Sequence, residues 1–288
     1  MTIDTICSGT DAQRNDDHVA VFHHAATTDI LVIDGGTSVA ARDHLGTAHG
    51  DVAWFVHAFT AALEPILASG QTQQQCVHAA IDRVREAFGR LPGFREMPLH
   101  AWPIAALSWL RIDGMSGGDH RRDATLYSLG DCKTLLRTSE DGCLDPDPFT
   151  NPQEHLLQAE IARLRAEGVH DATRRRQRML PLLRARREFQ NTTPTPSVLC
   201  LHPHGPFQPR IRRFGLAADA VVLLMTDGFY RLVEPYALYT DAQLVDACVR
   251  QGLPALLAAL RHHEAGGETG AQAVKPADDA SAVLWTGA

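Results

Sequence analysis

The order of apolar and polar positions predicts that short strands and amphipathic helices alternate along this chain. Apolar runs bounded by polar residues or glycine are typical of strands, and in the first half they lie at 19–22, 30–33, 104–112, 124–129 and 134–137. Apolar residues recur at helical spacing over 51–68 and 72–88, where Thr72 is suited to cap the second helix. The second half continues with strands predicted at 198–201, 221–225 and 282–285 and helices near 241–250 and 254–263.

One segment differs from the rest. Residues 152–168 are predicted to form an amphipathic helix, and an arginine-rich stretch interrupted by Pro181 follows it. Its arginines are Arg174, Arg175, Arg176, Arg178, Arg184, Arg186 and Arg187. Two interpretations are open, namely a solvated helical insertion or a patch that faces phosphate or a partner. Since no linker or internal repeat divides the chain, we expect one α+β domain over 1–288 with an arginine-rich helical insertion at about 152–190.

Composition narrows the class of protein. The 288 residues are 44% hydrophobic and 21% charged, which is typical of a globular protein with a large core. A net charge of −7 argues against a general nucleic-acid binder. No apolar run is long enough to span a membrane, and the N-terminus lacks the features of a signal peptide. We therefore expect a cytoplasmic protein that binds neither nucleic acid nor membrane.

Aspartates lie where the predicted strands begin or end. The strands at 30–33, 124–129 and 221–225 run into the pairs Asp34-Gly35, Gly130-Asp131 and, after one threonine, Asp227-Gly228. Two further acidic pairs, Asp16-Asp17 and Asp278-Asp279, precede the first and last strands. Carboxylates at strand ends are held by a rigid sheet and remain accessible to a ligand. Glycine beside the acid lets a backbone carbonyl approach a metal closely.

If these strand ends converge, five acidic positions with no opposing lysine repel one another, and bound cations or protonation would relieve the repulsion. Oxygen ligands suit Mg²⁺ or Mn²⁺, and not zinc or copper. Two such ions can activate a water molecule and hold a phosphoryl group for in-line attack. The six cysteines form no CxxC pair, so a structural zinc site is not indicated. Each aspartate taken alone also fits a turn or a helix cap.

Five short motifs in this order resemble those of the metal-dependent Ser/Thr protein phosphatases of type 2C. They are NDD at 15–17, VIDGG at 32–36, LYSLGDCK at 126–133, LLMTDGF at 223–229 and DDASAV at 278–283. The resemblance extends over nearly the whole chain and is to a compact, divergent bacterial branch. It implies a four-layer α-β-β-α sandwich with two mostly antiparallel sheets.

The resemblance also implies a site for two Mn²⁺ or Mg²⁺ ions. Its metal ligands would be Asp16, Asp17, Asp34, Gly35, Asp131, Asp227 and Asp278. Asp34 would bridge both ions, and the Gly35 carbonyl would complete the first site. Asp227 and Asp278 would bind the second ion, which Asp16 would reach directly or through water. Catalysis would depend on Asp34 and Asp227 through a bridging water that attacks the phosphate.

The remaining assignments concern a third ion, the arginine that binds the substrate phosphate and the general acid. Asp131 would help to hold a weaker third ion. The family often has an arginine for the substrate phosphate where this chain has Ala12, so Arg14 is the candidate for that role. Some members have a histidine where this chain has Gly36, which leaves the general acid unassigned.

The activity that the resemblance implies is hydrolysis of phosphoserine and phosphothreonine monoesters on a phosphoprotein substrate. Two alternatives stay open. One is hydrolysis of a small phosphorylated metabolite, and the other is a catalytically inactive, phosphate-binding adaptor of the same fold.

Overall fold

Eleven strands occur in the residues that the computed structural model describes, which are 1–11, 14–24, 26–114, 121–139, 142–151, 154–266 and 277–287. The strands are β1 Thr2–Ser8, β2 His18–His23, β3 Thr27–Gly35, β4 Ile104–Asp113, β5 Arg122–Leu129, β6 Lys133–Thr138, β7 Gly142–Leu144, β8 Leu199–Cys200, β9 Arg210–Leu216, β10 Val221–Met225 and β11 Ala280–Thr286. They form a five-stranded sheet of order β1-β11-β10-β6-β7 and a six-stranded sheet of order β2-β3-β4-β5-β9, in which β8 also pairs with β4. All of these pairings are antiparallel.

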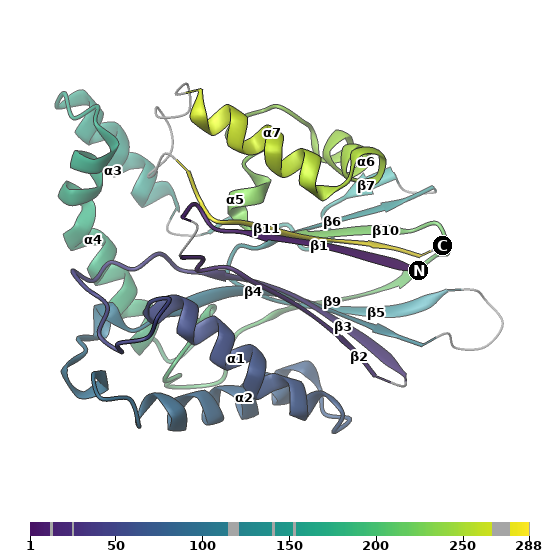
Figure 1. The fold of residues 1–288 in the computed structure, drawn as a ribbon, viewed down its shortest axis with the longest axis horizontal. Coiled ribbons are helices and arrows are strands. Elements are labelled where there is room, and N and C mark those ends of the chain that lie inside the picture. Colours follow the sequence, from purple (N-terminus) through teal and green to yellow (C-terminus); the bar gives the residue numbers. More distant parts are fainter. Residues whose placement is uncertain are drawn as a thin grey trace.

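The helices cover the outer faces of the two sheets and one end of the sandwich (Figure 1). They are α1 Asp51–Leu67, α2 Gln73–Phe88, α3 Glu154–Ala166, α4 Ala172–Thr192, α5 Asp227–Tyr230, α6 Asp241–Gln251 and α7 Leu253–Ala265, with 3₁₀ turns at Phe94–Glu96 and Leu99–Ala101. Helices α1 and α2 lie on the six-stranded sheet, and α6 and α7 lie on the five-stranded sheet (Figure 1). The predicted four-layer α+β sandwich is confirmed.

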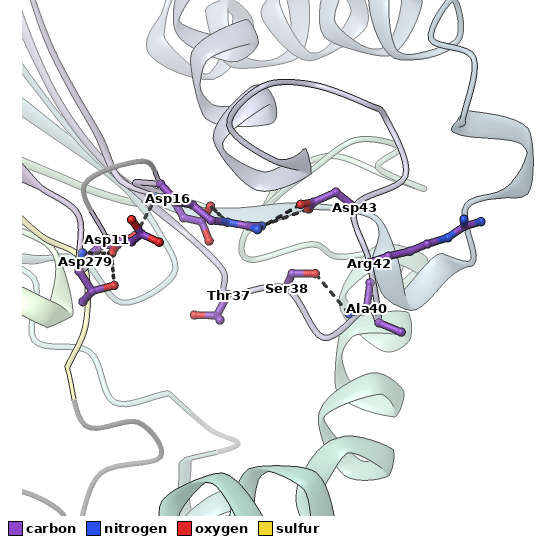
Figure 2. Close-up of a pocket in the computed structure, with 11 residues that line it drawn as sticks. Asp11, Asp16, Thr37, Ser38, Ala40, Arg42, Asp43 and Asp279 are labelled. Carbon is purple, nitrogen blue, oxygen red and sulfur yellow. Dashed lines mark hydrogen bonds and ion pairs between the residues drawn. The ribbon is translucent and has the colours of Figure 1, made fainter.

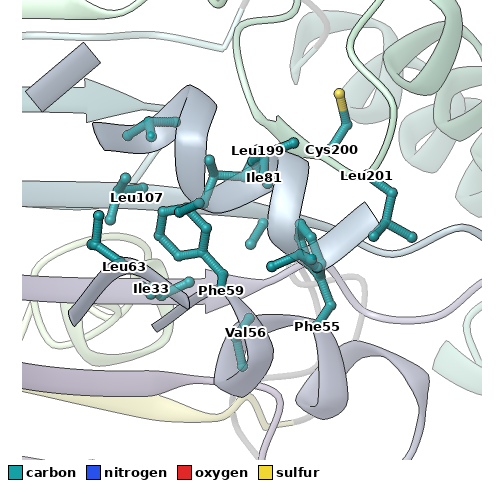
Figure 3. Close-up of a cluster of buried hydrophobic side chains, with 14 of the residues drawn as sticks. Ile33, Phe55, Val56, Phe59, Leu63, Ile81, Leu107, Leu199, Cys200 and Leu201 are labelled. Carbon is teal, nitrogen blue, oxygen red and sulfur yellow. The ribbon is translucent and has the colours of Figure 1, made fainter. Parts of the chain in front are cut away.

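The central strands are buried on both faces, because successive side chains of a strand point to opposite sides. In β3, Ile30 and Val32 pack between the two sheets. Leu31 and Ile33 point the other way, into the cluster beneath α1 and α2. Figure 3 shows this second cluster, in which Phe59 of α1 lies among the side chains of the sheet. The two-sided burial explains why the apolar run at 30–33 is continuous rather than alternating.

Local signals place several helix ends. The side chain of Thr72 accepts a hydrogen bond from the backbone N–H of Gln75, and the Gln75 side chain accepts one from the N–H of Thr72, which confirms the predicted cap. Thr240 and Gln243 form the same capping box at the start of α6. Within the described parts of the chain, no helix combines the length and apolar character needed to cross a membrane.

Three features differ from the sequence-based expectation. Strands β1, β7 and β9 were not expected, and each lies at the edge of its sheet. The arginine-rich stretch is not broken at Pro181, since α4 continues through it to Thr192. The helix expected from 152 is described from Glu154, because positions 152 and 153 lie outside the described residues.

Candidate active site

The register of the six-stranded sheet gathers three of the predicted acids. Ile33 pairs with His18, so Asp34 at the end of β3 lies beside Asp17, which precedes β2. Strand β4 pairs with both β3 and β5, and this places Asp131, just beyond β5, at the same end of the sheet. Antiparallel pairing therefore brings together chain segments that are distant in sequence.

The five-stranded sheet presents its acids at the same end of the sandwich. Met225, the last residue of β10, pairs with Ala282 near the start of β11. Asp227 is the first residue of α5, which follows β10. Asp278 lies just before β11, the strand that pairs with β10. The candidate site consequently lies where the two sheets meet.

Asp34 is half-buried at the centre of this cluster. Burial raises the pKa of its carboxyl group well above the ordinary value, and the charges of Asp227, Asp17, Asp278 and Asp131 raise it further. Its carboxylate accepts no hydrogen bond within the described residues. The predicted acids thus converge on one carboxyl group, whose ionised form is disfavoured in the absence of a bound cation.

Hydrogen bonds across the sheets fix Asp17. The Thr226 hydroxyl donates to Asp17 Oδ2 at 3.0 Å, and the same hydroxyl accepts from the Ser281 N–H at 3.0 Å. All three residues are buried. Burial raises the pKa of Asp17, and the hydrogen bonds from Ser281 and Thr226 oppose that rise. Asp17 therefore joins the start of β2 to the ends of β10 and β11.

Asp279, the second acid of its pair, organises the loop before Asp16. Its carboxylate accepts hydrogen bonds from the backbone N–H of Thr10 at 2.8 Å and of Asp16 at 2.7 Å. This interaction orients the loop that carries Asp16, which supports a structural role for Asp279.

The glycines of the two Asp-Gly pairs allow close approach of neighbouring backbone. A Cβ atom on Gly35 would lie 2.2 Å from the Asp16 carbonyl oxygen, and one on Gly228 would lie 1.9 Å from the Asp279 carbonyl oxygen. Any side chain at these positions would push the acidic loops apart. The Asp-Gly pattern thus has a packing cause in addition to the metal-binding role assigned to the Gly35 carbonyl.

The sequence showed no lysine to oppose the acids, but arginines oppose two of them in the structure. Arg231 Nη2 lies 3.0 Å from Asp278 Oδ2, and Arg14 Nε lies 3.6 Å from Asp16 Oδ1. Sequence reasoning considered only lysine and missed Arg231. The available signal was its place four residues after Asp227, at the end of the short helix α5.

A cavity of about 500 Å³ opens beside Asp16 and contains Arg14, the candidate phosphate ligand. Arg14 makes a two-point contact with Asp43, with both N–O distances at 3.1 Å. Figure 2 shows Asp16 and Asp43 lining this cavity, with the side chain of Arg42 directed away from Asp16. Ala12, where the family often has an arginine, lies outside the described residues. Arg14 is thus positioned between the acidic cluster and the cavity.

The arginine-rich helix α4 holds the loop that follows Asp34 and Gly35. Arg187 Nη2 donates to the carbonyl oxygens of Gly36 and Thr37 at 3.2 and 3.1 Å. Arg176 donates to the Ser38 carbonyl at 2.8 Å, and Arg184 donates to the Val39 carbonyl at 3.0 Å. Four successive carbonyls, at positions 36–39, are therefore bound by one helix.

The same helix also packs against Gly36, where the type 2C resemblance has a histidine in some members. Arg187 is 7% exposed, and a Cβ atom on Gly36 would lie 3.1 Å from its Nη2 atom. Burial lowers the pKa of Arg187 to about 10, helped by the charges of Arg186 and Arg176. A side chain at position 36 would require Ile104 and this guanidinium to shift by a few tenths of an ångström. The helix is therefore not a wholly solvated insertion, although Arg174 and Arg178 are exposed.

The donor set at this site fits a hard divalent cation in its chemistry. It consists of carboxylate oxygens around Asp34, with the Gly35 backbone adjacent, and such ligands suit Mg²⁺ or Mn²⁺. The distances between these side chains fit a bound ion less well than their chemistry does. In the part of the chain that is described, no three histidine, cysteine, aspartate or glutamate side chains are grouped closely enough to hold one metal ion.

Comparison with known protein families and with curated proteins finds no match. Solved structures do match. A serine/threonine phosphatase of S. agalactiae aligns over 99% of both chains with a TM-score of 0.55 at 12% identity. The Mycobacterium tuberculosis serine/threonine phosphatase PstP/Ppp aligns over 98% of this chain and 97% of its own, with a TM-score of 0.50 at 17% identity. The Staphylococcus aureus serine/threonine phosphatase Stp1 covers 98% of this chain and 93% of its own, with a TM-score of 0.52 at 10% identity. At these identities the likeness establishes a shared fold.

Proposed function

We propose that this chain is a divalent-cation-dependent phosphatase that hydrolyses phosphoserine and phosphothreonine monoesters on protein. The observation that carries the proposal is that the strand registers place Asp17, Asp131, Asp227 and Asp278 at the same end of the sandwich as Asp34, close enough for their charges to raise its pKa. The fold shared with serine/threonine phosphatases also supports the proposal.

Asp34 and Asp227 would hold the cations, with Asp278, Asp16, Asp17, Asp131 and the Gly35 carbonyl as the further ligands. Bound Mn²⁺ or Mg²⁺ supplies Lewis acidity, which makes water a stronger nucleophile and offsets charge on the phosphoryl group. The protein's own contribution is to orient these carboxylates. Thr226 fixes Asp17, Asp279 orients the backbone of Asp16, and α4 holds the loop after Gly35.

The test is hydrolysis of p-nitrophenyl phosphate and of a phosphothreonine peptide, each with Mn²⁺ and with EDTA. We expect turnover of both substrates with Mn²⁺ and none with EDTA. Turnover of phosphorylated small molecules but not of any phosphopeptide would favour the metabolite hydrolase.

A second candidate function is the inactive phosphate-binding adaptor. The pairing of Arg231 with Asp278 and of Arg14 with Asp16 favours it, because arginines then occupy two of the proposed metal ligands. Tight phosphopeptide binding without turnover at any Mn²⁺ concentration would support this alternative.

Arg14 is expected to contribute to binding of the substrate phosphate. Charged hydrogen bonds contribute about 1.5–3 kcal/mol, so Arg14→Ala should raise KM for p-nitrophenyl phosphate about tenfold or more. Its matched control is Arg90→Ala, since the Arg90 side chain is 80% exposed and remote from the cavity. Steady-state kinetics of the two variants checks the prediction. Equal KM values would contradict a role of Arg14 in binding the substrate phosphate.

A further inference from the structure

Arg231 occupies a position beside the acidic cluster that the proposed function leaves unexplained. It follows α5, which begins with Asp227, and its Nη2 atom lies 3.0 Å from Asp278 Oδ2. The two side chains are 11% and 14% exposed, so water screens this ion pair only weakly.

A network of buried charges holds Arg231 in this orientation. Its Nη1 atom lies 3.7 Å from a carboxylate oxygen of Glu264, which is 4% exposed. Arg261 binds the other Glu264 oxygen at 2.7 Å and donates to the Asp278 backbone carbonyl at 2.7 Å. The guanidinium and the backbone of Asp278 are thus fixed by the same set of contacts.

Both carboxylate oxygens of Asp278 already have hydrogen-bond donors. Arg231 donates to Oδ2, and the backbone N–H of Asp279 donates to Oδ1 at 3.0 Å. A divalent cation bound to Asp278 would have to share this carboxylate with a fixed guanidinium of the same sign of charge. Like charges at such short range in a partly buried site repel each other strongly.

Arg231 also acts on the other acid assigned to the second cation. Its backbone N–H donates to the Asp227 carbonyl oxygen at 3.1 Å, so Arg231 and Asp227 lie on the same turn of the chain. The guanidinium therefore supplies positive charge to the side of the cluster where the type 2C resemblance places the second ion.

We infer that Arg231 takes the place of the second cation, so that this chain binds one divalent ion, at Asp34 and Asp227, where the family pattern has two. This inference depends on the proposed function, since it concerns the same acidic site. On this inference Asp278 is a partner of Arg231 and leaves the set of metal ligands given under the proposed function.

The experiment is a titration of the full-length protein with Mn²⁺. Binding is measured by calorimetry and by the electron paramagnetic resonance signal of free Mn²⁺. We expect one bound ion per chain for the unmodified protein and two for Arg231→Gln. A matched control is Arg137→Gln, which removes an arginine of β6 paired with Asp246 of α6 and should leave one ion bound.

A second variant keeps the test valid if Arg231→Gln does not fold. Asp278→Asn should leave the stoichiometry at one, because Asp278 holds no ion in the unmodified protein. A stoichiometry of two in the unmodified protein, or of one in a folded Arg231→Gln, would overturn the inference.

Activity measured on the same samples separates this inference from the proposed function. Mn²⁺-dependent hydrolysis with two bound ions would overturn only the role of Arg231. Absence of both Mn²⁺ binding and hydrolysis would overturn the inference together with the proposed function.

Discussion

Replacing Asp34 by asparagine is expected to abolish Mn²⁺-dependent turnover while leaving the protein folded. Changes in residues that merely orient a metal ligand cost about 10- to 100-fold in affinity or activity. Loss of the carboxylate on which the other acids converge should therefore lower kcat by more than about 100-fold. Asparagine keeps the shape of the side chain and removes only its charge. Asp227→Asn is expected to have the same effect.

The same substitution should stabilise the metal-free protein at neutral pH. The pKa of Asp34 is raised in the folded state by burial and by four neighbouring carboxylates, so ionising Asp34 costs more in the folded chain than in the unfolded chain. Stability of the unmodified protein should consequently fall as pH rises through this raised pKa. The gain in Tm from Asp34→Asn should be largest at neutral pH and should vanish near pH 4.

Thermal unfolding in EDTA from pH 4 to pH 8, together with phosphatase assays in Mn²⁺, tests both parts. Asp82→Asn is a suitable control, because Asp82 is an exposed residue of α2. Normal turnover of Asp34→Asn, or hydrolysis by the unmodified protein in EDTA, would contradict the assignment of Asp34.

Removing the guanidinium of Arg187 is expected to have the second largest effect. Arg187→Met leaves the carbonyls of Gly36 and Thr37 without their buried donor, and the loop after Asp34 and Gly35 loses its anchor to α4. Losing a contact that orients a metal ligand costs about 10- to 100-fold in affinity or activity. We therefore expect kcat to fall by about this factor and the affinity for Mn²⁺ to weaken.

Two further variants identify the cause of this effect. Arg187→Lys should recover little of the activity, because an ammonium group does not reproduce the fork of donors that a guanidinium offers to two carbonyls. Arg174→Ala should behave like the unmodified protein, since this side chain is exposed on the same helix. Equal losses in Arg174→Ala and Arg187→Met would mean that the charge of the helix matters and not the contact with the loop.

The sequence by itself determined those features of this protein that depend only on residues adjacent in the chain. The apolar run at 30–33 predicted a buried strand, and Thr72 predicted the start of α2, because side-chain alternation and helix caps are local effects. The Asp-Gly pairs at strand ends also carried a local signal. Their convergence follows once the strands pair in antiparallel register, which places the ends of β3 and β10 at one end of the sandwich.

Strands β1 and β9 were decided by tertiary structure. Both are edge strands whose residues are largely exposed, so neither shows a continuous apolar run. Strand β9 contains Arg210, Arg212 and Arg213, and its pairing with β5 supplies the order that its own side chains do not specify.

The roles of the arginines were likewise invisible in the sequence. Arg176, Arg184 and Arg187 contact carbonyls more than one hundred positions earlier in the chain. Arg231 contacts Asp278, which lies 47 positions later. The sequence does not show whether a given arginine side chain is solvated or buried. Only the packing of α4 and α5 against the strand ends decided which arginines bind loop carbonyls, which oppose the acids and which remain in water.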